Sequence, residues 1–412
     1  MSDARTILVI GTYDTKDAEL NFVRDRIREL GGNVISMDVS VLGDPDAPTD
    51  ISKHEVAAAA GKTIQDAIDS GDENHAMQIM AEGAAKLTAD LQASGRIHGM
   101  LALGGTMGTD LALDCARALP IGVPKYVVST VAFSALIPPE RLSADIQMIL
   151  WAGGLYGLND ICMATLSQAA GAVWGAAQAV VAPDPDRPVI GMVSFGSSAL
   201  QYMVHLRQPL IDRGFSLAVF HGTGMGGMAM ESLAEQGYFA CVLELAVAEI
   251  GNLMVGSVVN AGAHRMTAAG RRGTPIIAAP GFGDMIDFAA WQPVPARFRD
   301  RQYHAHNRLI ASAALTAEER CHLAREVAGR LKKSKGPVQF VLPTHGIHAW
   351  DTEGMPAHDP EALATMVEAY KSEMTAPVEL TVMDCHINDL AFSEKVVEII
   401  DGWVADGTIR ME

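Results

Sequence analysis

The chain has 412 residues, of which 49% are hydrophobic and 19% are charged, and its formal net charge is −18. This apolar content excludes an intrinsically disordered protein, and the length predicts two domains, because single cores stop growing at roughly 250–300 residues. The acidic balance argues against a general binder of nucleic acids or anionic membranes, since phosphate contacts need a basic face.

The sequence predicts neither export nor membrane insertion. The first apolar run, residues 7–10, is too short for the apolar region of a signal peptide, and residues 169–183 fall short of the roughly 18 apolar residues that a membrane span needs. The five cysteines are scattered and form no CxxC pair, which favours reduced thiols over a disulfide framework. We therefore expect a cytoplasmic protein without zinc fingers.

The first half of the chain alternates strands, glycine-rich turns and helices. Apolar runs predict strands, and apolar side chains at helical spacing, such as Leu20, Val23 and Ile27, predict helices that end at glycines. In chain order we expect a strand at 6–11, a helix ending at 31–32, a strand at 33–41, helices at 56–68 and 75–94, a strand at 98–105, a helix at 106–119 and a strand at 125–132. This alternation is typical of a doubly wound parallel sheet.

Residues 182–188, with three prolines and three charged residues, form the best candidate for a domain boundary. The same pattern restarts beyond them, with a predicted helix through 205–214 and predicted strands at 189–196, 216–222, 239–245, 274–281, 337–343 and 377–384. We therefore predict an α/β fold of two Rossmann-like, doubly wound subdomains with mostly parallel sheets. The first, at 1–182, is the expected nucleotide-binding domain, and the second spans 189–412.

The turn GTYDTK follows the first strand and has the composition of a phosphate site, although it matches neither GxGxxG nor GxxxxGK[ST]. At such a strand end Gly11 permits close backbone approach, and the start of the next helix is expected to offer unpaired N–H groups. Thr12 and Thr15 add hydroxyl donors, and Lys16 adds a positive charge, unless it is simply an exposed first-turn lysine. Asp14 has two interpretations: a helix N-cap, or a ligand of a ribose hydroxyl or Mg²⁺.

Two further turns lie at predicted strand ends of the same sheet. GGTMGT places glycines at the end of a strand and leads into a helix, and such a turn can form a nest of backbone donors around an anion. A plain strand-to-helix turn with Thr109 as its cap is the alternative. STVA follows the next strand. Together with GTYDTK these turns predict a nucleotide or phosphorylated ligand, held also by Gly104, Gly105, Thr106, Gly108, Thr109, Ser129 and Thr130.

Loops at the strand ends of the second domain carry most of the chain's unusual polar residues. Those that could serve acid–base catalysis or bind a divalent metal are His221, Glu231, Asp284, His345, Asp351 and His386. The spacing His-x-x-His-x-x-Asp, from His345 through His348 to Asp351, is not diagnostic of a metal site. The structural alternative is that histidines donate to backbone carbonyls and that Asp384 and Asp389 cap a helix.

Short motifs along nearly the whole chain resemble one known family. GTYDTK followed by EL, the GGT.GT turn, STVA, and DI.M leading to GLN.I are followed in the second half by FHGTG.GG.AME, PG..DM..F, HN, DPEA and HIND. In this order the motifs are similar to the family of ATP-binding domains named after the tomato mosaic virus resistance protein. The resemblance implies two Rossmann-like subdomains, ATP bound through the first, and a homodimer.

The chain departs from that family's pattern in three places. Met107 stands where a glycine is usual in the glycine-rich turn, and Gly154 stands where an acidic residue is common. Residues Ala311 to Leu315 replace a segment that normally ends in arginine. These changes bear on the affinity for ATP and leave the predicted fold unaffected.

The sequence therefore supports two functions of different classes. In the first, the protein is an ATP-binding module and a homodimer, with Mg²⁺ as a further candidate cofactor and with no nucleic-acid or membrane partner. In the second, it is an enzyme of the hydrolase, lyase or ATP-dependent ligase type that acts on a small carboxylated or phosphorylated metabolite through the His and Asp loops of the second domain. The resemblance favours the first, and the number of polar loop residues favours the second.

Overall fold

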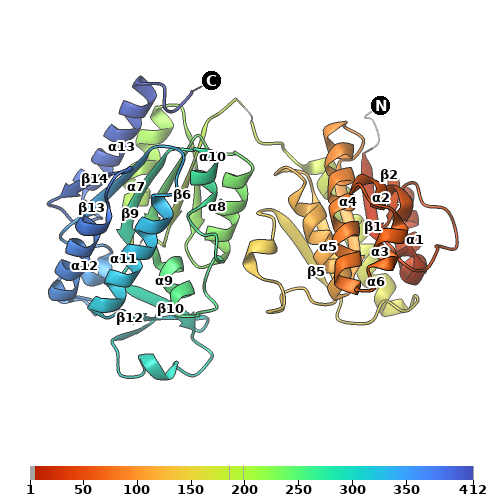
Figure 1. Cartoon of the computed structure of the whole chain (residues 1–412), viewed down its shortest axis with the longest axis horizontal. Helices are drawn as coiled ribbons and strands as arrows, with labels where there is room; N and C mark the ends of the chain where they lie inside the picture. The colour runs from red at the N-terminus through yellow and green to blue at the C-terminus, as the bar shows by residue number, and fades with distance from the viewer. Residues whose placement is uncertain (1–4, 185, 198, 412) are drawn as a thin grey trace. The chain divides into compact units, whose positions relative to one another are not determined.

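The structure is a computed structural model that describes residues 5–184, 186–197 and 199–411. The chain folds into two compact units, Met1–Pro183 and Asp184–Glu412, each with its own parallel sheet (Figure 1). Helices and parallel strands alternate in both units, so the predicted α/β fold with two Rossmann-like halves is confirmed.

The first unit is built on a five-stranded parallel sheet with the order β2-β1-β3-β4-β5. Its strands are β1 (Thr6–Gly11), β2 (Asn33–Asp38), β3 (Gly99–Gly104), β4 (Lys125–Ser129) and β5 (Ile146–Leu150). The apolar run of β1 is buried on both faces, which is typical of a parallel strand covered by helices on two sides. The edge strand β5 is not predicted from the sequence.

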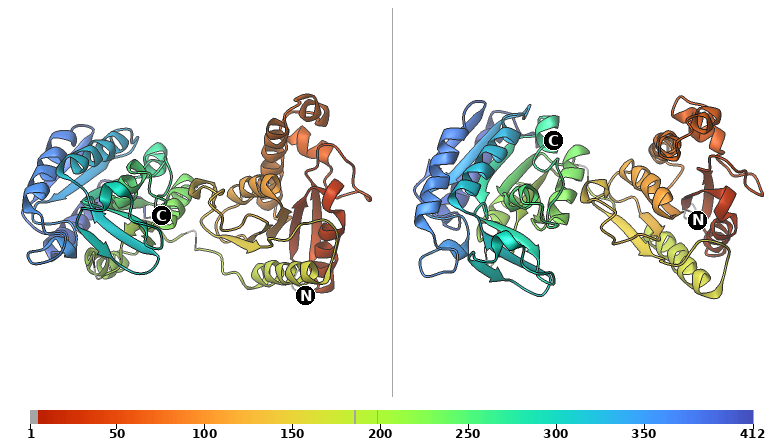
Figure 2. Two further views of the ribbon diagram at one scale, coloured as in Figure 1. Left: turned by 90° about the horizontal axis from the view of Figure 1, so that it is seen from below. Right: turned by 60° about the horizontal axis from the view of Figure 1, so that its bottom comes forward.

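Helices cover both faces of this sheet (Figure 2). One face carries α1 (Tyr13–Glu29) and α6 (Asp160–Ala179), and the other carries α2 (Lys53–Ala59), α4 (Glu73–Ala93) and α5 (Thr106–Arg117), with α3 (Ile64–Asp69) packed on α4. A 3₁₀ turn, η1 (Pro139–Arg141), follows β4. The single helix predicted at 56–68 is wrong: Gly61, at φ +71°, ends α2, and a capping box of Thr63 and Asp66 starts α3.

The second unit is built on a six-stranded parallel sheet with the order β14-β13-β9-β8-β6-β7, and all six strands are predicted from the sequence. They are β6 (Val189–Ser194), β7 (Ser216–His221), β8 (Cys241–Ala246), β9 (Ile276–Gly281), β13 (Val338–Pro343) and β14 (Val378–Met383). The helices of this unit are α7 (Tyr202–Asp212), α8 (Met225–Glu235), α9 (Ala248–Met254), α10 (Ala268–Arg272), α11 (Ala317–Leu331), α12 (Pro360–Glu373) and α13 (Leu390–Ala405).

A small antiparallel sheet, which the sequence does not predict, is inserted after β9. Its strands, in the order β10-β12-β11, are β10 (Met285–Ala289), β12 (Ile310–Ala314) and β11 (Tyr303–Ala305). The 3₁₀ turn η2 (Ala296–Phe298) precedes β11, and η3 (Ala349–Asp351) follows β13. β10 packs against α9, which joins this insertion to the main body of the second unit.

Both parallel sheets reverse their strand order beside their first strand. β2 and β3 flank β1 in the first unit, and β7 and β8 flank β6 in the second. In open α/β sheets ligands bind at this switch point, in the crevice beyond the carboxyl ends of the strands. In the first unit the crevice is bounded by GTYDTK after β1 and by GGTMGT after β3.

Among the described helices, none combines the length and the apolar composition that a membrane span requires. The five cysteines are free thiols, and Cys115, Cys162, Cys241 and Cys385 are buried. Burial raises the pKa of the Cys115 thiol to about 12 and that of Cys385 to about 11, which is expected of unreactive cysteines.

Candidate functional site

A cavity of about 670 Å³ lies at the switch point of the first unit. Its polar wall comes from the turns after β1 and β3. Its other wall comes from the segment after β2 and from the α3–α4 hairpin, and it is made of Val39, Val41, Leu42, Ala67, Ile68, Ala76 and Met77, with Asp72 and Glu73 at the start of α4. Small-molecule sites in proteins have volumes of about 300–1,000 Å³, so this cavity can enclose a nucleotide.

Two of the predicted turns meet at this cavity. β1 and β3 are hydrogen-bonded neighbours, so their carboxyl ends place GTYDTK and GGTMGT side by side. The residues of these turns that line the cavity are Thr12, Asp14, Thr15, Lys16, Gly104, Gly105, Thr106 and Gly108. Polar side chains and backbone from two strand ends therefore face a single space.

Four other residues predicted to hold a cofactor lie behind the cavity wall. The hydroxyl oxygens of Thr109 and Ser129 are 2.7 Å apart, and both side chains are buried. Thr130 donates its backbone N–H to the Gly104 carbonyl, and Gly11 packs against α1. These residues hold the turns together. Thr109 does not cap α5, because the N-cap residue is Gly105, so that interpretation is wrong.

The start of α1 has no unpaired donors to offer an anion. The N–H of Tyr13 donates to the carboxylate of Asp38, and the N–H of the next residue donates to the Ser40 hydroxyl. The following two N–H groups donate to the Thr12 carbonyl. The expectation of unpaired N–H groups here is therefore wrong, because the segment after β2 folds back over the helix start and supplies acceptors.

Two other helices begin at the same cavity. α4 is capped by Asp72, whose carboxylate accepts a first-turn N–H, and Glu73 adds a second carboxylate beside it. α5 follows Gly105, which has no side chain to cap it, and the N–H groups of residues 106–108 have no acceptor in the described part of the chain. Unpaired N–H groups and the helix dipole attract anions. The start of α5 is therefore the best anion site at this cavity.

Lys16 supplies a positive charge to the polar wall. Its backbone leaves the helical region, at φ −134° and ψ 26°. Its ammonium group donates to the hydroxyls of Thr12 and Thr15, at 3.1 and 3.2 Å, and it forms no ion pair with any described carboxylate. A lysine that contacts only neutral hydroxyls has no counter-charge, so its ammonium group is available to pair with an incoming anion.

Asp14 does not cap α1, so the cap interpretation is wrong. The N-cap residue is Thr12, and the Asp14 carboxylate accepts through Oδ2 from the backbone N–H of Gly43 at 3.2 Å. The second carboxylate oxygen, Oδ1, is buried and has no hydrogen-bond partner within the described residues. A buried carboxylate oxygen normally has a hydrogen-bond or metal partner. Either predicted ligand, a ribose hydroxyl or a divalent cation, would supply that partner.

Of the departures from the family pattern, Met107 bears directly on the cavity. This residue is 49% exposed and lines the cavity, where a glycine would leave more room. Gly154 accepts from the indole N–H of Trp151, and a Cβ at this position would meet the Tyr156 ring at 2.5 Å. The segment from Ala311 onward forms the buried strand β12 of the antiparallel sheet.

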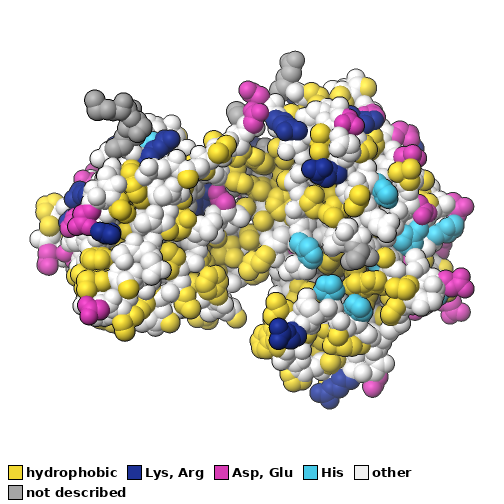
Figure 3. All heavy atoms as spheres, turned by 180° about the vertical axis from the view of Figure 1, so that it is seen from behind, with side chains coloured by type: hydrophobic (Ala, Val, Ile, Leu, Met, Phe, Trp, Pro, Cys, Tyr) yellow, Lys and Arg dark blue, Asp and Glu magenta, His cyan; other side chains and the backbone are white. Residues whose placement is uncertain are grey.

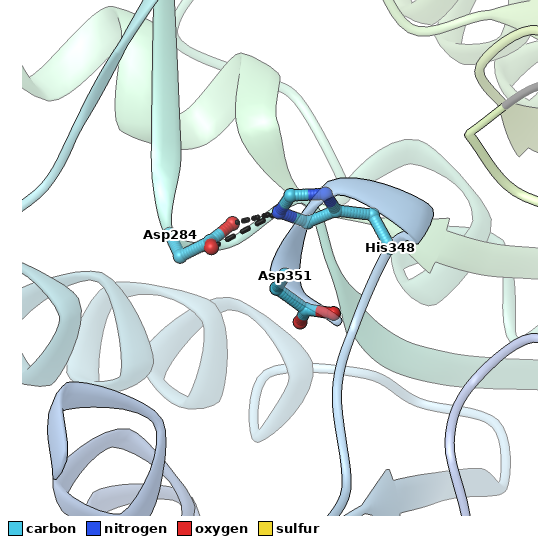
Figure 4. Close-up of side chains that lie close together, drawn as sticks. All are labelled: Asp284, His348 and Asp351. Carbon is cyan, nitrogen blue, oxygen red and sulfur yellow. Dashed lines mark hydrogen bonds and ion pairs between the residues drawn. The ribbon is translucent and has the colours of Figure 1, made fainter. Parts of the chain in front are cut away.

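In the second unit, the loops after β9 and β13 form a buried Asp–His pair (Figure 4). Nε2 of His348 lies 2.9 and 3.0 Å from the two carboxylate oxygens of Asp284. Burial alone would lower the pKa of His348, but the charge and hydrogen bond of Asp284 outweigh it, so this pKa is raised. Burial would raise the pKa of Asp284, but His348 and the more distant Arg320 outweigh it, so this pKa is lowered.

A second Asp–His pair joins the loops after β13 and β14. Nε2 of His386 lies 3.1 Å from Oδ1 of Asp351, whose Oδ2 accepts from the backbone N–H of Ile347. In both pairs Nδ1 of the histidine accepts a backbone N–H two residues further on, from Trp350 or Asn388. Nε2 must then carry a proton in both rings, so neither ring has a free nitrogen that could act as a base.

Asp284, His348 and Asp351 also lie close enough to share one metal ion, with ligand atoms within 4.8 Å of one another (Figure 4). A histidine ligand must present a deprotonated nitrogen. His348 turns a protonated Nε2 toward this cluster, because its Nδ1 accepts from Trp350. The arrangement therefore suits the closure of two loops better than it suits a metal site.

Histidine and apolar side chains gather on one face of the second unit (Figure 3). His304 packs against Trp350 with ring centroids 4.2 Å apart, and His306 lies 6.3 Å from His304. Burial, followed by the charge of His306, lowers the pKa of His221, which lies beside Thr223. A lowered pKa leaves this imidazole neutral near pH 7 and able to accept a proton, so its catalytic role stays a prediction.

His345 and Glu231, also predicted as catalytic, lie apart from the two buried pairs. His345 is exposed, and its Nε2 lies 2.8 Å from the exposed carboxylate of Asp384. Glu231 accepts from the backbone N–H groups of Met266 and Ala268 at the start of α10. Burial raises the pKa of Glu231 despite the nearby Arg265, which is consistent with a structural role of this side chain in the protein interior.

Arg265 is the centre of a buried network that fills the switch point of the second unit. Its side chain is 1% exposed and contacts the carboxylates of Glu231, Glu244 and Glu249. Glu249 also accepts from two backbone N–H groups at the start of α8, those of residues 224 and 227. The glycine-rich turn of the second unit therefore holds a carboxylate of the protein itself, in the place where an anionic ligand would bind.

Sequence reasoning missed the part of the cavity wall that the α3–α4 hairpin forms. Residues 67–77 carry an ordinary helical pattern, and nothing in their spacing marks them as facing a ligand. The acidic start of α4, at Asp72 and Glu73, is a helix-capping signal that was available but does not predict a cavity. Only tertiary packing brings this hairpin over the strand ends.

Comparisons with known proteins agree with this division into two halves. Residues 5–182 match the model of the N-terminal domain of the uncharacterised protein family UPF0261, and residues 187–404 match that of its C-terminal domain. A UPF0261 protein of Brucella melitensis is 51% identical over 98% of this chain and 96% of its own length, and one of Clostridium tetani is 33% identical over 96% and 99%. The ToMV susceptible protein tm-1(GCR26) of Solanum lycopersicum is 26% identical, over 96% of this chain and 55% of its own length.

Proposed function

The chain belongs to the uncharacterised protein family UPF0261, and we propose that it is a nucleotide-binding protein whose ligand, ATP, occupies the cavity of the first unit. One observation carries the proposal. Within the described residues, the start of α5 keeps its first-turn N–H groups unpaired, at the same cavity as the unpaired charge of Lys16. A phosphate group would satisfy the helix start and the lysine together.

The glycine-rich turns before α5 and α8 differ in whether their helix starts are already paired, and this difference supports the assignment. At α8 the carboxylate of Glu249 already accepts from the helix start, whereas the N–H groups at the start of α5 lack an acceptor among the residues described. The start of α5 can therefore accept an anion, whereas the start of α8 already holds a carboxylate. The resemblance to a family of ATP-binding domains favours ATP over other phosphorylated ligands.

The side chains around the polar wall are also suited to a divalent cation that accompanies the phosphates. Oδ1 of Asp14 is buried without a partner in the described chain, and the hydroxyls of Thr12 and Thr15 lie at the same wall. Oxygen atoms of these types are the usual ligands of Mg²⁺. If Mg²⁺ binds here, it would neutralise phosphate charge beside the Asp14 carboxylate.

The second unit supplies a candidate enzyme site, but its geometry favours it less. Both ring nitrogens of His348 and of His386 are already hydrogen-bonded, which suits loop closure better than proton transfer. His221 is the better candidate for a base. Replacement of His221 by alanine is expected to leave ATP binding intact, so any loss of turnover in that variant would identify an enzyme function separate from the nucleotide site.

Calorimetric titration with a non-hydrolysable ATP analogue, with and without Mg²⁺, tests the proposed function. Saturable binding is expected for the wild type, and Lys16→Met should weaken it by at least about tenfold, because a hydrogen bond to a charged group contributes about 1.5–3 kcal/mol. Lys62→Met, which removes an exposed lysine of the same unit outside the cavity, is the matched control. No binding at millimolar analogue, or equal binding by Lys16→Met, would contradict the proposal.

The homodimer implied by the family resemblance is part of the same proposal. Sedimentation velocity of the purified protein, with and without the ATP analogue, measures the mass of the species in solution. A dimer in either condition supports the proposal, and a monomer in both conditions removes this part of it.

A further inference from the structure

The charged groups that line the cavity favour one orientation of a bound nucleotide. Lys16 and the open start of α5 lie on one wall, and the carboxylates of Asp72 and Glu73 lie at the start of α4 beside the apolar wall. Asp14 on the first wall has Lys16 beside it, whereas Asp72 and Glu73 have no lysine or arginine of their own segment among the lining residues. Carboxylates without such a partner repel phosphates, so the phosphates are placed at Lys16 and the start of α5 and not at the start of α4. The base must then lie against the apolar side chains of the α3–α4 hairpin, such as Ile68 and Met77.

Glu73 is the carboxylate available to contact that base. The Asp72 side chain already accepts a backbone N–H and caps α4. Glu73 is exposed and forms no side-chain hydrogen bond or ion pair with any other residue that the structure describes. Its carboxylate repels carbonyl oxygens and accepts hydrogen bonds from amino groups, so it distinguishes bases whose edges carry different groups.

On the basis of the nucleotide site proposed above, we infer that Glu73 is a specificity-determining residue that accepts a hydrogen bond from the exocyclic amino group of adenine. The apolar hairpin holds the face of the base, and Glu73 reads its amino edge. This arrangement selects adenine nucleotides against purine nucleotides that lack the amino group. Such selection is separate from phosphate binding, since it involves Glu73 and not Lys16 or the start of α5.

The experiment compares ATP with purine riboside 5′-triphosphate, which lacks only the 6-amino group. By calorimetry, the wild type should bind ATP at least about tenfold more tightly than the analogue, the value expected for a hydrogen bond to a charged group. Glu73→Ala should lower the affinity for ATP by about the same factor and leave the affinity for the analogue unchanged. Glu82→Ala removes an exposed carboxylate of the same helix away from the cavity and should change neither affinity.

The outcomes separate the two proposals. Equal affinities of the wild type for ATP and the analogue, or an undiminished preference in Glu73→Ala, overturn the role of Glu73 and leave the nucleotide site standing. If the wild type binds neither compound, the nucleotide site itself is wrong. The wild-type comparison needs no variant, so it decides the matter even if Glu73→Ala does not fold.

Discussion

Replacing Gly105 by aspartate should change ligand affinity and stability in opposite directions. Gly105 is the N-cap of α5, with φ −75° and ψ −154°, an extended conformation that any residue adopts. A Cβ at this position would have the Thr130 hydroxyl oxygen, at 3.9 Å, as its nearest neighbour, so the new side chain fits. Its carboxylate would accept from the unpaired N–H groups at the start of α5, as Asp72 does at α4.

The two effects have different sizes. An aspartate in place of glycine at an N-cap adds a few tenths of a kcal/mol, and its charge at the positive helix end adds about 0.3–1 kcal/mol. For a unit of this size that corresponds to a rise of about 1–4 °C in the melting temperature. The same carboxylate about 4 Å from a phosphate costs about 4 kcal/mol at an effective dielectric constant near 20. We therefore expect the affinity for ATP to fall by at least about 100-fold.

Thermal unfolding without ligand and calorimetric titration with the ATP analogue measure the two effects separately. Gly105→Ala, which adds a methyl group without a charge or a cap, is the control and should melt no higher than the wild type. If Gly105→Asp binds the analogue within about threefold of the wild type, the phosphates do not lie at the start of α5. A fall of several degrees in its melting temperature would refute the reasoning about the uncapped helix.

Two further substitutions test the packing around the sites. Gly104→Ala should destabilise the first unit by about 1–3 kcal/mol in urea unfolding, because its Cβ would meet the Gly108 backbone at 2.6 and 2.7 Å; a variant as stable as Gly105→Ala would contradict this. Asp284→Asn should destabilise the second unit by about 1.5–3 kcal/mol at pH 7, because it removes the charged acceptor of the hydrogen bond that buried His348 donates. The Asp284 pKa is lowered, so this carboxylate stabilises the fold above about pH 4 and the stabilisation is lost as the pH falls through the lowered pKa. Unfolding measured across acid pH should therefore show a weaker pH dependence in Asp284→Asn than in the wild type, and parallel curves would contradict the assignment.

The sequence predicts the parallel sheets well because their strands are short, local signals. The inner strands β8, β9 and β13 are mostly apolar runs preceded by glycine or proline, and they are buried because helices cover both faces of the sheet. The antiparallel sheet escapes prediction because its short strand β11, Tyr303–Ala305, is only three residues long and mostly exposed. The prediction of a single helix over 56–68 fails at Gly61. Helical spacing alone would continue the helix through this residue, but its positive φ forms a tight turn that ends the helix.

The site shows the same division between local and long-range information. The positions of Lys16 and Gly105 at strand ends follow from the sequence, because the carboxyl ends of neighbouring parallel strands share one edge. The state of each helix start does not follow, since Asp38 and Ser40 reach the start of α1 from another strand end. The sequence therefore predicts the right turns, but it predicts unpaired donors at both α1 and α5. In the structure only the donors at the start of α5 are unpaired, when these two helices are compared.

A crystal structure of the protein with a non-hydrolysable ATP analogue and Mg²⁺ tests the central claim most directly. The account predicts phosphate oxygens within about 2.7–3.2 Å of the backbone N–H groups of residues 106–108, with the Lys16 ammonium group turned from the threonine hydroxyls to the phosphates. Phosphates bound anywhere else on the chain, or a cavity that remains without ligand at saturating analogue, would contradict it.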